Sequence, residues 1–466
     1  MRAAVVVIGG GITGLAAAMR LAERIDPAGI VLLEAQEQLG GKIRTERTGD
    51  FVLEGGPDCF LATRPAGVEL CRRLGIADQL VGTNPTLRQS FVKRAGRLHP
   101  LPEGISGLVP SRLMPLLTTG ILSPAGRLRA GLELLVPAAR GAGDESVAQF
   151  ARRRFGAEAY DWLIEPLLSG IYAGDGDRLS LMATFPQMRE TELRHGSLLK
   201  PMLTARFRDR GTTGGRAGFV TLPGGLGDLV AALATRLTRV QILTGAPVRS
   251  VREGEIGREY RVELSDGRII DSDAVVLTAP APASAALLES MDRELSALLR
   301  QIAVVSTATV SLAFPRSAVP APLAGYGYVS PRVEGGPLVA CSWTSNKFAG
   351  RAPADTVLLR CFLGRAGHDE IVTAGNDILL GVARDELRRV HGINAAPLLS
   401  RVVRWPGGMP QYTLGHADRL ARIGSRLTGH PGLRLAGASY RGVGIPDCIA
   451  SGWAAADSLA VPVEAA

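Results

Sequence analysis

Lysine is scarce in this sequence, and arginine carries almost all of the basic charge. Only four of the 53 basic residues in the 466-residue chain are lysines, so 49 are arginines, and the net charge is +9. The arginines are scattered, and basic runs interleaved with aromatic residues are missing, which argues against a nucleic-acid-binding protein. The positive charge suits an anionic ligand or an anionic surface instead.

Paired cysteines and metal-binding motifs are also missing. The five cysteines are odd in number and widely spaced, without a C-x-x-C pair, and the six histidines form neither H-E-x-x-H nor H-x-H. We therefore expect no disulfide framework, no metal site and a reducing compartment. The cysteines are Cys59, Cys71, Cys341, Cys361 and Cys448.

An apolar run long enough to span a membrane is absent as well, since such a helix needs about 18 residues. The nearest approach is residues 113–126, which are interrupted by Pro115, Gly120 and Pro124. A segment of this kind is typical of a patch that lies on a membrane, but also of a substrate-entry lip or a buried hairpin. We expect a cytoplasmic protein, with peripheral attachment to the inner face of the cell membrane as an open alternative.

The strongest motif lies at the N-terminus. A buried strand at Val5–Ile8 leads into the turn Gly9-Gly10-Gly11-Ile12-Thr13-Gly14 and then into a helix of small residues. Such a turn lets the backbone approach a diphosphate, to which the helix start offers N–H groups and a partial positive charge. A second strand ends in Glu34, twenty residues after Gly14, where a carboxylate accepts ribose hydroxyls. These features predict a dinucleotide-binding site.

A second glycine pair favours FAD over NAD. Gly40 and Gly41 follow Glu34 closely and precede Lys42. A plain NAD domain has no need of this pair, whereas it lets the backbone pass beside the diphosphate and ribitol of an extended FAD.

Later segments return to the first domain, so we predict interleaved domains of an α/β (α+β mixed) fold. Residues 240–278 form a strand meander that ends in a buried strand, and residues 433–459 repeat the strand, glycine turn and helix of the N-terminus. We expect a Rossmann-like FAD-binding domain, an α+β substrate-binding domain and a helical, membrane-facing insertion. Their predicted ranges are 1–50, 217–285 and 428–466 for the first, 51–90, 184–216 and 286–427 for the second, and 91–183 for the third.

Several separated segments resemble one family. They are the N-terminal glycine motif with residues 39–45, then residues 54–60, 163–186, 405–412 and 437–449. Together they resemble the oxygen-dependent protoporphyrinogen and coproporphyrinogen oxidases of the flavin amine oxidase superfamily, and most closely the bacterial coproporphyrinogen III type. One departure is Lys42, where the superfamily often carries arginine.

The resemblance implies FAD bound without a covalent link. It also implies that the carbonyls around Ala173 and Gly174, with Tyr172 beside them, face the pyrrole N–H groups of a substrate, and that Arg64 meets a propionate. A solvated arginine at a helix start explains Arg64 equally well. The resemblance points to positioning and water exclusion rather than to an acid–base residue. The residues implied to hold FAD are Gly9, Gly10, Gly11, Ile12, Thr13, Gly14, Glu34, Ala35, Gly41, Lys42, Gly56, Pro57, Asp58, Cys59, Val248, Trp405, Ala438, Val443, Gly444 and Ile445.

The implied activity is the oxidation of coproporphyrinogen III to coproporphyrin III in haem biosynthesis, with three dioxygen molecules reduced to hydrogen peroxide. Oxidation of protoporphyrinogen IX is the first alternative. A flavin amine oxidase, with Tyr440 and Trp405 in an aromatic cage, is the second, and a flavoprotein that binds porphyrin without turnover is the third. Expected partners are the porphyrinogen, dioxygen, a membrane surface and, transiently, a ferrochelatase.

Overall fold

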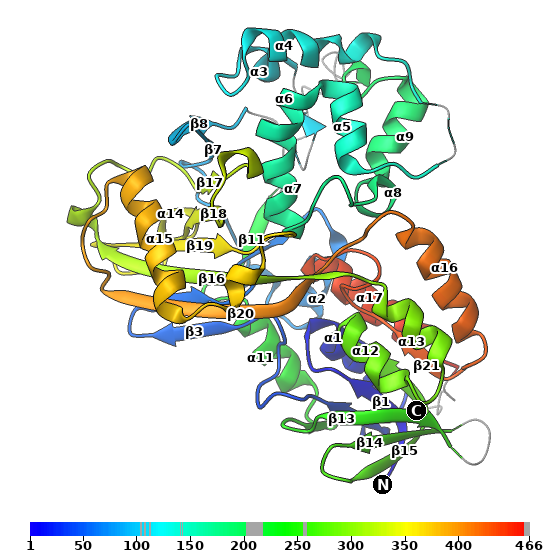
Figure 1. Cartoon of the computed structure of the whole chain (residues 1–466). Helices are drawn as coiled ribbons and strands as arrows, with labels where there is room; N and C mark the ends of the chain where they lie inside the picture. The colour runs from blue at the N-terminus through cyan, green and yellow to red at the C-terminus, as the bar shows by residue number, and fades with distance from the viewer. Residues whose placement is uncertain are drawn as a thin grey trace.

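The computed structural model describes residues 1–102, 105–106, 109–110, 113–139, 141, 143–201, 218–254 and 259–460. These residues form two large sheets and a group of helices (Figure 1). The N-terminal sheet lies at the bottom of that view, the second sheet above it and to the left, and the helical layer at the top. The mixed α/β fold class predicted from the sequence is confirmed.

The N-terminal sheet brings together strands from both ends and the middle of the chain. Five strands run parallel, in the order β12-β2-β1-β15-β21, and β14 and β13 continue from β15 as an antiparallel meander. The strand that ends the predicted meander is β15, which pairs with β14 through its first half and with β21 through its second. The strands are β1 (Arg2–Ile8), β2 (Ile30–Leu33), β12 (Gln241–Leu243), β13 (Val248–Glu253), β14 (Tyr260–Leu264), β15 (Ile269–Leu277) and β21 (Leu433–Leu435).

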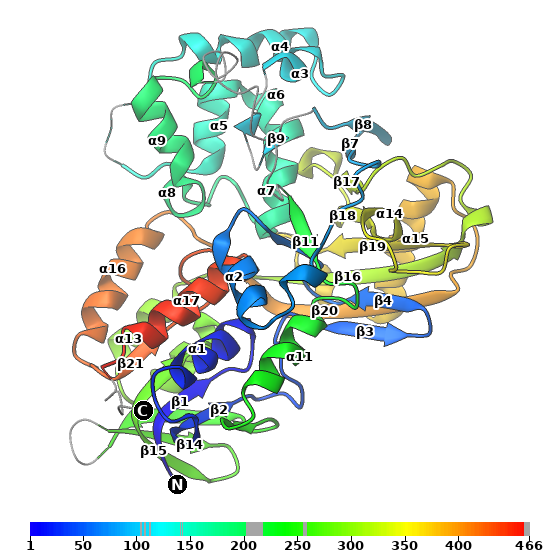
Figure 2. The ribbon, with the colours of Figure 1, turned by 180° about the vertical axis from the view of Figure 1, so that it is seen from behind.

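Both faces of this sheet are covered, which explains why residues 5–8 of β1 and all of β2 are apolar. Val5 and Val7 of β1 face one core, whereas Val6 and Ile8 face the other, as the two-residue period of a strand requires. The first core is closed by α1 (Ile12–Ala22), α11 (Gly227–Arg236) and α17 (Ile445–Asp457), of which α1 and α17 lie side by side (Figure 2). The second is closed by α12 (Ala281–Leu288), α13 (Arg293–Arg300) and α16 (His416–Leu427).

The second sheet carries the predicted substrate domain. Its seven strands have the order β20-β16-β19-β18-β17-β7-β8, and α15 (Asn376–His391) packs on one face. The bounds are β7 (Ser90–Arg94), β8 (Arg97–Pro100), β16 (Val304–Pro315), β17 (Gly327–Val329), β18 (Leu338–Trp343), β19 (Thr356–Leu363) and β20 (Leu399–Pro410).

The two faces of the second sheet differ in chemistry. Alternate apolar side chains such as Val310 and Leu359 form a core under α15. The residues between them point to the opposite face, where Thr309 and Arg360 are buried polar side chains. That opposite face meets the turn 55–59, to which Thr309 donates a hydrogen bond.

The helical layer has a core of its own. Its helices are α3 (Leu113–Thr118), α4 (Pro124–Gly131), α5 (Val147–Phe155), α6 (Ala157–Ala159), α7 (Glu165–Tyr172), α8 (Leu181–Thr184) and α9 (Pro186–His195). Ser146 caps the start of α5 in a reciprocal capping box with Gln149.

Two predicted domain boundaries fall within units of the structure. The boundary at residue 91 falls within β7, which belongs with β8 to the second sheet. Residues 184–216 are predicted as part of the substrate domain, and within them Phe185 and Met188 pack into the helical core. Helix α2, which follows the turn at residues 55–59, covers Pro65–Arg73. Residues 202–217 lie outside the described part.

Candidate functional site

The first glycine turn has the close packing that its sequence predicts. Gly9 adopts a left-handed φ of +111°, which glycine reaches without strain. A Cβ on Gly14 would lie 1.8 Å from the Gly9 carbonyl oxygen, so α1 can start against the turn only with glycine there. By contrast, the nearest atom to a Cβ on Gly11 would be the Gly41 Cα, 3.9 Å away. The space beside Gly11 is therefore open to a ligand.

The second glycine pair lies directly against the first. The Gly40 N–H donates to the Gly10 carbonyl at 2.9 Å, and Gly11 and Gly40 form a parallel bridge. Helix α1 begins at Ile12 after Gly11, and no described side chain caps its start. The first N–H groups of α1 and the backbone of Gly41 are thus available to a diphosphate.

Glu34 closes the far side of this turn. It is 8% exposed, and its carboxylate accepts hydrogen bonds from the N–H groups of Gly10 (2.7 Å) and Gln36 (2.8 Å). Val248 lies nearby, because the Ala246 N–H donates to the Glu34 carbonyl at 2.9 Å. A ribose hydroxyl here would meet a carboxylate that the backbone already orients. Ala35, the next residue, is exposed.

The turn at residues 55–59 links this site to the second sheet. A Cβ on Gly56 would lie 1.7 Å from the Lys42 carbonyl oxygen, so the turn and the lysine loop touch through glycine. The Trp405 indole donates to the Gly55 carbonyl at 2.8 Å, and Arg360 donates to the Gly56 carbonyl. The structure therefore brings Gly56 and Trp405 together, as expected for one binding site.

Asp58, at the end of this turn, forms a buried ion pair with Lys347. The ammonium group lies 2.9 and 3.1 Å from the two carboxylate oxygens and 3.4 Å from the Cys59 sulfur. Burial alone would raise the pKa of Asp58, but the charges of Lys347 and Arg360 outweigh it and hold that pKa far below its usual range. Burial raises the pKa of the Cys59 thiol. At neutral pH the group is therefore a fixed carboxylate, an ammonium and a neutral thiol.

The C-terminal turn meets the N-terminal turn through helix packing. A Cβ on Gly452 of α17 would lie 2.3 Å from the Thr13 carbonyl oxygen, so α1 and α17 approach closely. The start of α17 follows Val443 and Gly444, and no described side chain caps it. The Tyr412 hydroxyl holds the same turn by donating to the Ala438 carbonyl at 2.6 Å. Ile445, the first residue of α17, is buried. The two uncapped helix starts thus belong to one site.

The end of α7 is held by hydrogen bonds from neighbouring segments. Ala173 has a left-handed φ of +50°, and its carbonyl accepts a hydrogen bond from the Ala366 N–H at 2.8 Å. The Gly174 carbonyl accepts one from Arg332 at 3.4 Å. Each carbonyl accepts a hydrogen bond within the protein and has a second lone pair, so the contact with pyrrole N–H groups stays a prediction. Tyr172 is buried, and its carbonyl accepts from the Gln411 side chain.

Arg64 lies at the start of α17. Its guanidinium is 3.4 Å from the Asp447 carboxylate, and its side chain is 61% exposed. Tyr172 lies close to both side chains. Burial raises the pKa of Tyr172 to about 12, the Asp447 carboxylate raises it further, and the Arg64 guanidinium lowers it. The single contact to Asp447 leaves most of the five N–H donors of Arg64 free for a carboxylate.

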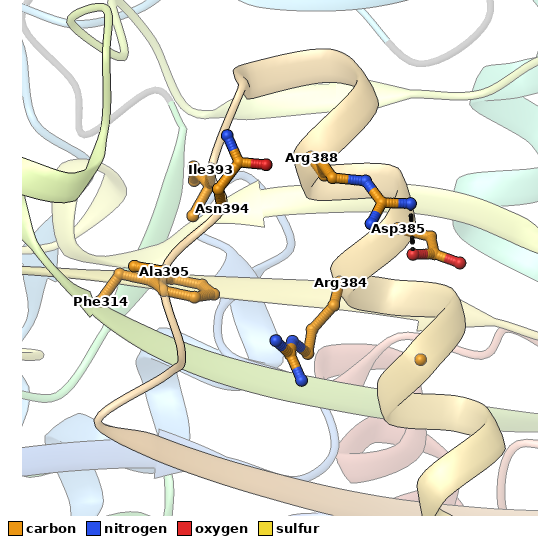
Figure 3. Close-up of a pocket in the computed structure, with 8 residues that line it drawn as sticks. Phe314, Arg384, Asp385, Arg388, Ile393, Asn394 and Ala395 are labelled. Carbon is orange, nitrogen blue, oxygen red and sulfur yellow. Dashed lines mark hydrogen bonds and ion pairs between the residues drawn. The ribbon is translucent and has the colours of Figure 1, made fainter.

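A solvent-facing hollow of about 260 Å³ lies elsewhere, between α15 and residues 393–395 (Figure 3). Arg388 in its lining is paired with Asp385 at 2.9 Å. Phe314, also in the lining, belongs to the core under α15, so the hollow is on the face of the second sheet away from Gly55. It is separate from the candidate site.

All five cysteines are free thiols. Within the described ranges, His, Cys, Asp and Glu side chains do not gather in groups of three that could hold a metal ion. The same ranges hold no helix that is both long and apolar enough to cross a membrane.

Comparison with known proteins identifies the family of this chain and the cofactor of the site. Residues 12–460 match the model of the flavin-containing amine oxidoreductases, a range that starts at the first residue of α1 and includes the second glycine pair, the second sheet and α17. The chain belongs to the flavin-containing amine oxidoreductase family. A dinucleotide turn in a flavin-dependent oxidoreductase is an FAD site, so the predicted cofactor is confirmed. The open space at Gly11 and the two uncapped helix starts fit that cofactor.

Several relatives of this chain are named as porphyrinogen oxidases. They confirm the family resemblance found in the sequence. Coproporphyrinogen III oxidase of Bacillus subtilis (strain 168) is 39% identical over 461 residues, covering 97% of this chain and 96% of the relative. The chloroplastic protoporphyrinogen oxidase 1 of Arabidopsis thaliana is 30% identical over 95% of this chain and 85% of its own length. A solved candidate protoporphyrinogen oxidase of Exiguobacterium sp. 255-15 is 34% identical, has a TM-score of 0.85 and covers 98% of both chains.

Sequence reasoning missed two buried cations of the site. Lys347 pairs with Asp58 across 289 residues, and Arg360 reaches Gly56 across 304. Such distances leave no local pattern in the sequence. The scarcity of lysine was the one signal in the sequence. Two of the four lysines, Lys347 and Lys93, form buried ion pairs, and Lys93 pairs with Glu386 at 2.6 Å.

Proposed function

We propose that this flavoenzyme oxidises coproporphyrinogen III to coproporphyrin III. Six electrons and six hydrogens leave the substrate in three two-electron rounds, and three dioxygen molecules take them up as three molecules of hydrogen peroxide. When bound, FAD accepts a hydride from the substrate in each round and passes the electrons on to dioxygen. The observation that carries the proposal is the match along nearly the whole chain to coproporphyrinogen III oxidase of Bacillus subtilis.

The chain's own residues would position the reactants rather than exchange protons. The start of α1, Glu34 and the turn at Gly56 would hold the dinucleotide, as their geometry allows. The uncapped start of α17 would place a partial positive charge near the flavin ring. Arg64 would bind one propionate, because its guanidinium is exposed and only partly used by Asp447.

Anaerobic mixing tests the oxidation step directly. Addition of coproporphyrinogen III to the purified holoenzyme should bleach the flavin absorbance without oxygen, and air should restore it. Turnover in air should then yield three peroxides per coproporphyrin. Flavin that stays oxidised in the presence of the porphyrinogen would contradict the proposal and favour a protein that binds porphyrin without turnover.

Protoporphyrinogen IX is the second candidate substrate, supported by the plant relatives. An amine substrate has less support. Tyr440 was expected to form part of an aromatic cage, but it is 7% exposed and packs into the core under α12, with its hydroxyl near Ser284. A ring enclosed in this way offers little surface to an amine. Peroxide formation from amines would restore that alternative.

We also propose that the helical layer rests on a membrane surface. Leu128, Leu132 and Leu135 follow one another at helical spacing and are 67, 42 and 78% exposed. Flotation with anionic vesicles should carry the wild-type protein, and Leu128→Asp/Leu135→Asp should remain unbound. The membrane contact is predicted over residues 101–130, of which 103–104, 107–108 and 111–112 lie outside the described residues. Cytoplasmic residence and transient contact with a ferrochelatase remain predictions.

A further inference from the structure

One buried donor beside the turn at Gly56 lacks a partner. Arg360 is 3% exposed, and one of its terminal amino groups donates to the Gly56 carbonyl. Its Nε–H has no acceptor among the described residues. Leaving a buried charged donor unpaired is costly, so native proteins rarely do so without a ligand or water to accept the bond.

Arg360 lies beside the candidate cofactor site. Arg360 points from β19 to the face of the second sheet that meets the turn, where the Gly56 backbone touches the Lys42 carbonyl. Lys42 follows the glycine pair that lies against the diphosphate turn. The guanidinium also lies 4.7 Å from the centre of the Phe362 ring, which fixes its orientation.

Arg360 belongs to a group of charges beside the turn. The other cations are Lys347 and Arg351, and the carboxylates that act on the group are Asp58, Glu54 and Asp228. Burial lowers the pKa of Arg360, but a guanidinium stays protonated in proteins, so the charge of Arg360 persists at neutral pH.

We infer that Arg360 binds the flavin ring of FAD, with its Nε–H donating to an acceptor on the ring and its charge opposing the negative charge that the ring gains on reduction. This inference rests on the FAD cofactor of the proposed function, and not on the choice of porphyrinogen. A fixed cation at low dielectric favours the reduced, more anionic cofactor over the oxidised one. Arg360 therefore raises the reduction potential of the bound cofactor and adds to its affinity.

The test measures the reduction potential of the FAD in purified holoenzymes, by equilibration with a reference dye. Arg360→Gln should shift the two-electron equilibrium at least about tenfold towards oxidised FAD, which corresponds to roughly 30 mV. Arg401→Gln removes the same charge from β20, where the side chain is 44% exposed and paired with Glu46, and should leave the potential unchanged. An unchanged potential in Arg360→Gln overturns the inference.

Arg360→Lys provides a second readout in case the glutamine variant does not fold. It retains the charge but loses the Nε–H, so the potential should stay near the wild-type value while the dissociation constant of FAD rises about tenfold or more. Wild-type affinity in this variant would overturn the assigned hydrogen bond. If porphyrinogens are not oxidised and the Arg360 effects are still seen, the proposed function fails and the inference stands. If porphyrinogens are oxidised and both Arg360 effects are absent, the inference alone fails.

Discussion

Replacing Lys347 by methionine should destabilise the protein strongly, because Asp58 would be left buried without its main counter-charge. The two side chains are only 16 and 12% exposed, and their atoms are 2.9 Å apart. Removing one partner of such a pair typically costs about 3–5 kcal/mol, since the remaining charge stays desolvated. Arg360 also lowers the pKa of Asp58 and would retain part of the stabilisation, so we expect about 3 kcal/mol.

This loss should depend on pH. In the wild type, the pKa of Asp58 is depressed, so its stabilisation is present above the unfolded pKa and is lost only in strong acid. The pKa of Lys347 is lowered by burial but raised more by Asp58, so its stabilisation persists until the pH exceeds the unfolded value of 10.5. In Lys347→Met, burial raises the pKa of Asp58 with less opposition, and a proton can neutralise the carboxylate. The difference in stability should therefore be largest near pH 7 and shrink towards pH 4.5.

Urea unfolding at several pH values, followed by flavin fluorescence and circular dichroism, measures this difference. The double variant Lys347→Met/Asp58→Asn is the matched control, because it removes both charges and should cost less than the single variant. A stability difference that stays constant from pH 4.5 to pH 7, or a double variant as costly as the two single losses together, would refute the reasoning.

Other substitutions test separate parts of the account. Gly14→Ala should yield protein without FAD, because its Cβ would lie 1.8 Å from a carbonyl oxygen. The ratio of flavin to protein absorbance measures this loss. Gly424→Ala in α16 is the control and should keep full FAD, because no neighbouring atom lies within 4 Å of an added Cβ there. Trp405→Phe removes the donor to Gly55 and should weaken FAD binding by about 1 kcal/mol, roughly fivefold in a titration; unchanged affinity would separate Trp405 from the site. Ser146→Ala should cost the helical layer about 1 kcal/mol in denaturant, with FAD binding intact.

The parts of the structure that depend on neighbouring residues could be predicted from the sequence. The strand Val5–Ile8, the glycine turn and the helix after it follow from local periodicity and from the conformations that only glycine adopts. Helix α15 follows the same periodicity, since its buried residues Leu379, Ala383 and Leu387 recur every four positions. The capping of α5 by Ser146 also rests on a signature within four residues.

Contacts between distant segments could not be predicted in this way. The alternation on β19 shows that Arg360 and Leu359 point to opposite faces, but nothing in the sequence says which face meets Gly56. The boundary predicted at residue 91 took no account of the pairing of β7 with β17, because the two strands are more than 200 residues apart. The same limit applies to Ala173, whose carbonyl is engaged by Ala366.

The most direct test of the proposed function is the rate of porphyrin fluorescence increase in air, compared as kcat/KM for coproporphyrinogen III and protoporphyrinogen IX. The account predicts a clear preference for coproporphyrinogen III, together with a loss of that preference in Arg64→Ala, because the variant lacks the exposed guanidinium for a propionate. A preference for protoporphyrinogen IX would contradict the substrate assignment. No fluorescence from either compound would contradict the oxidation of porphyrinogens altogether.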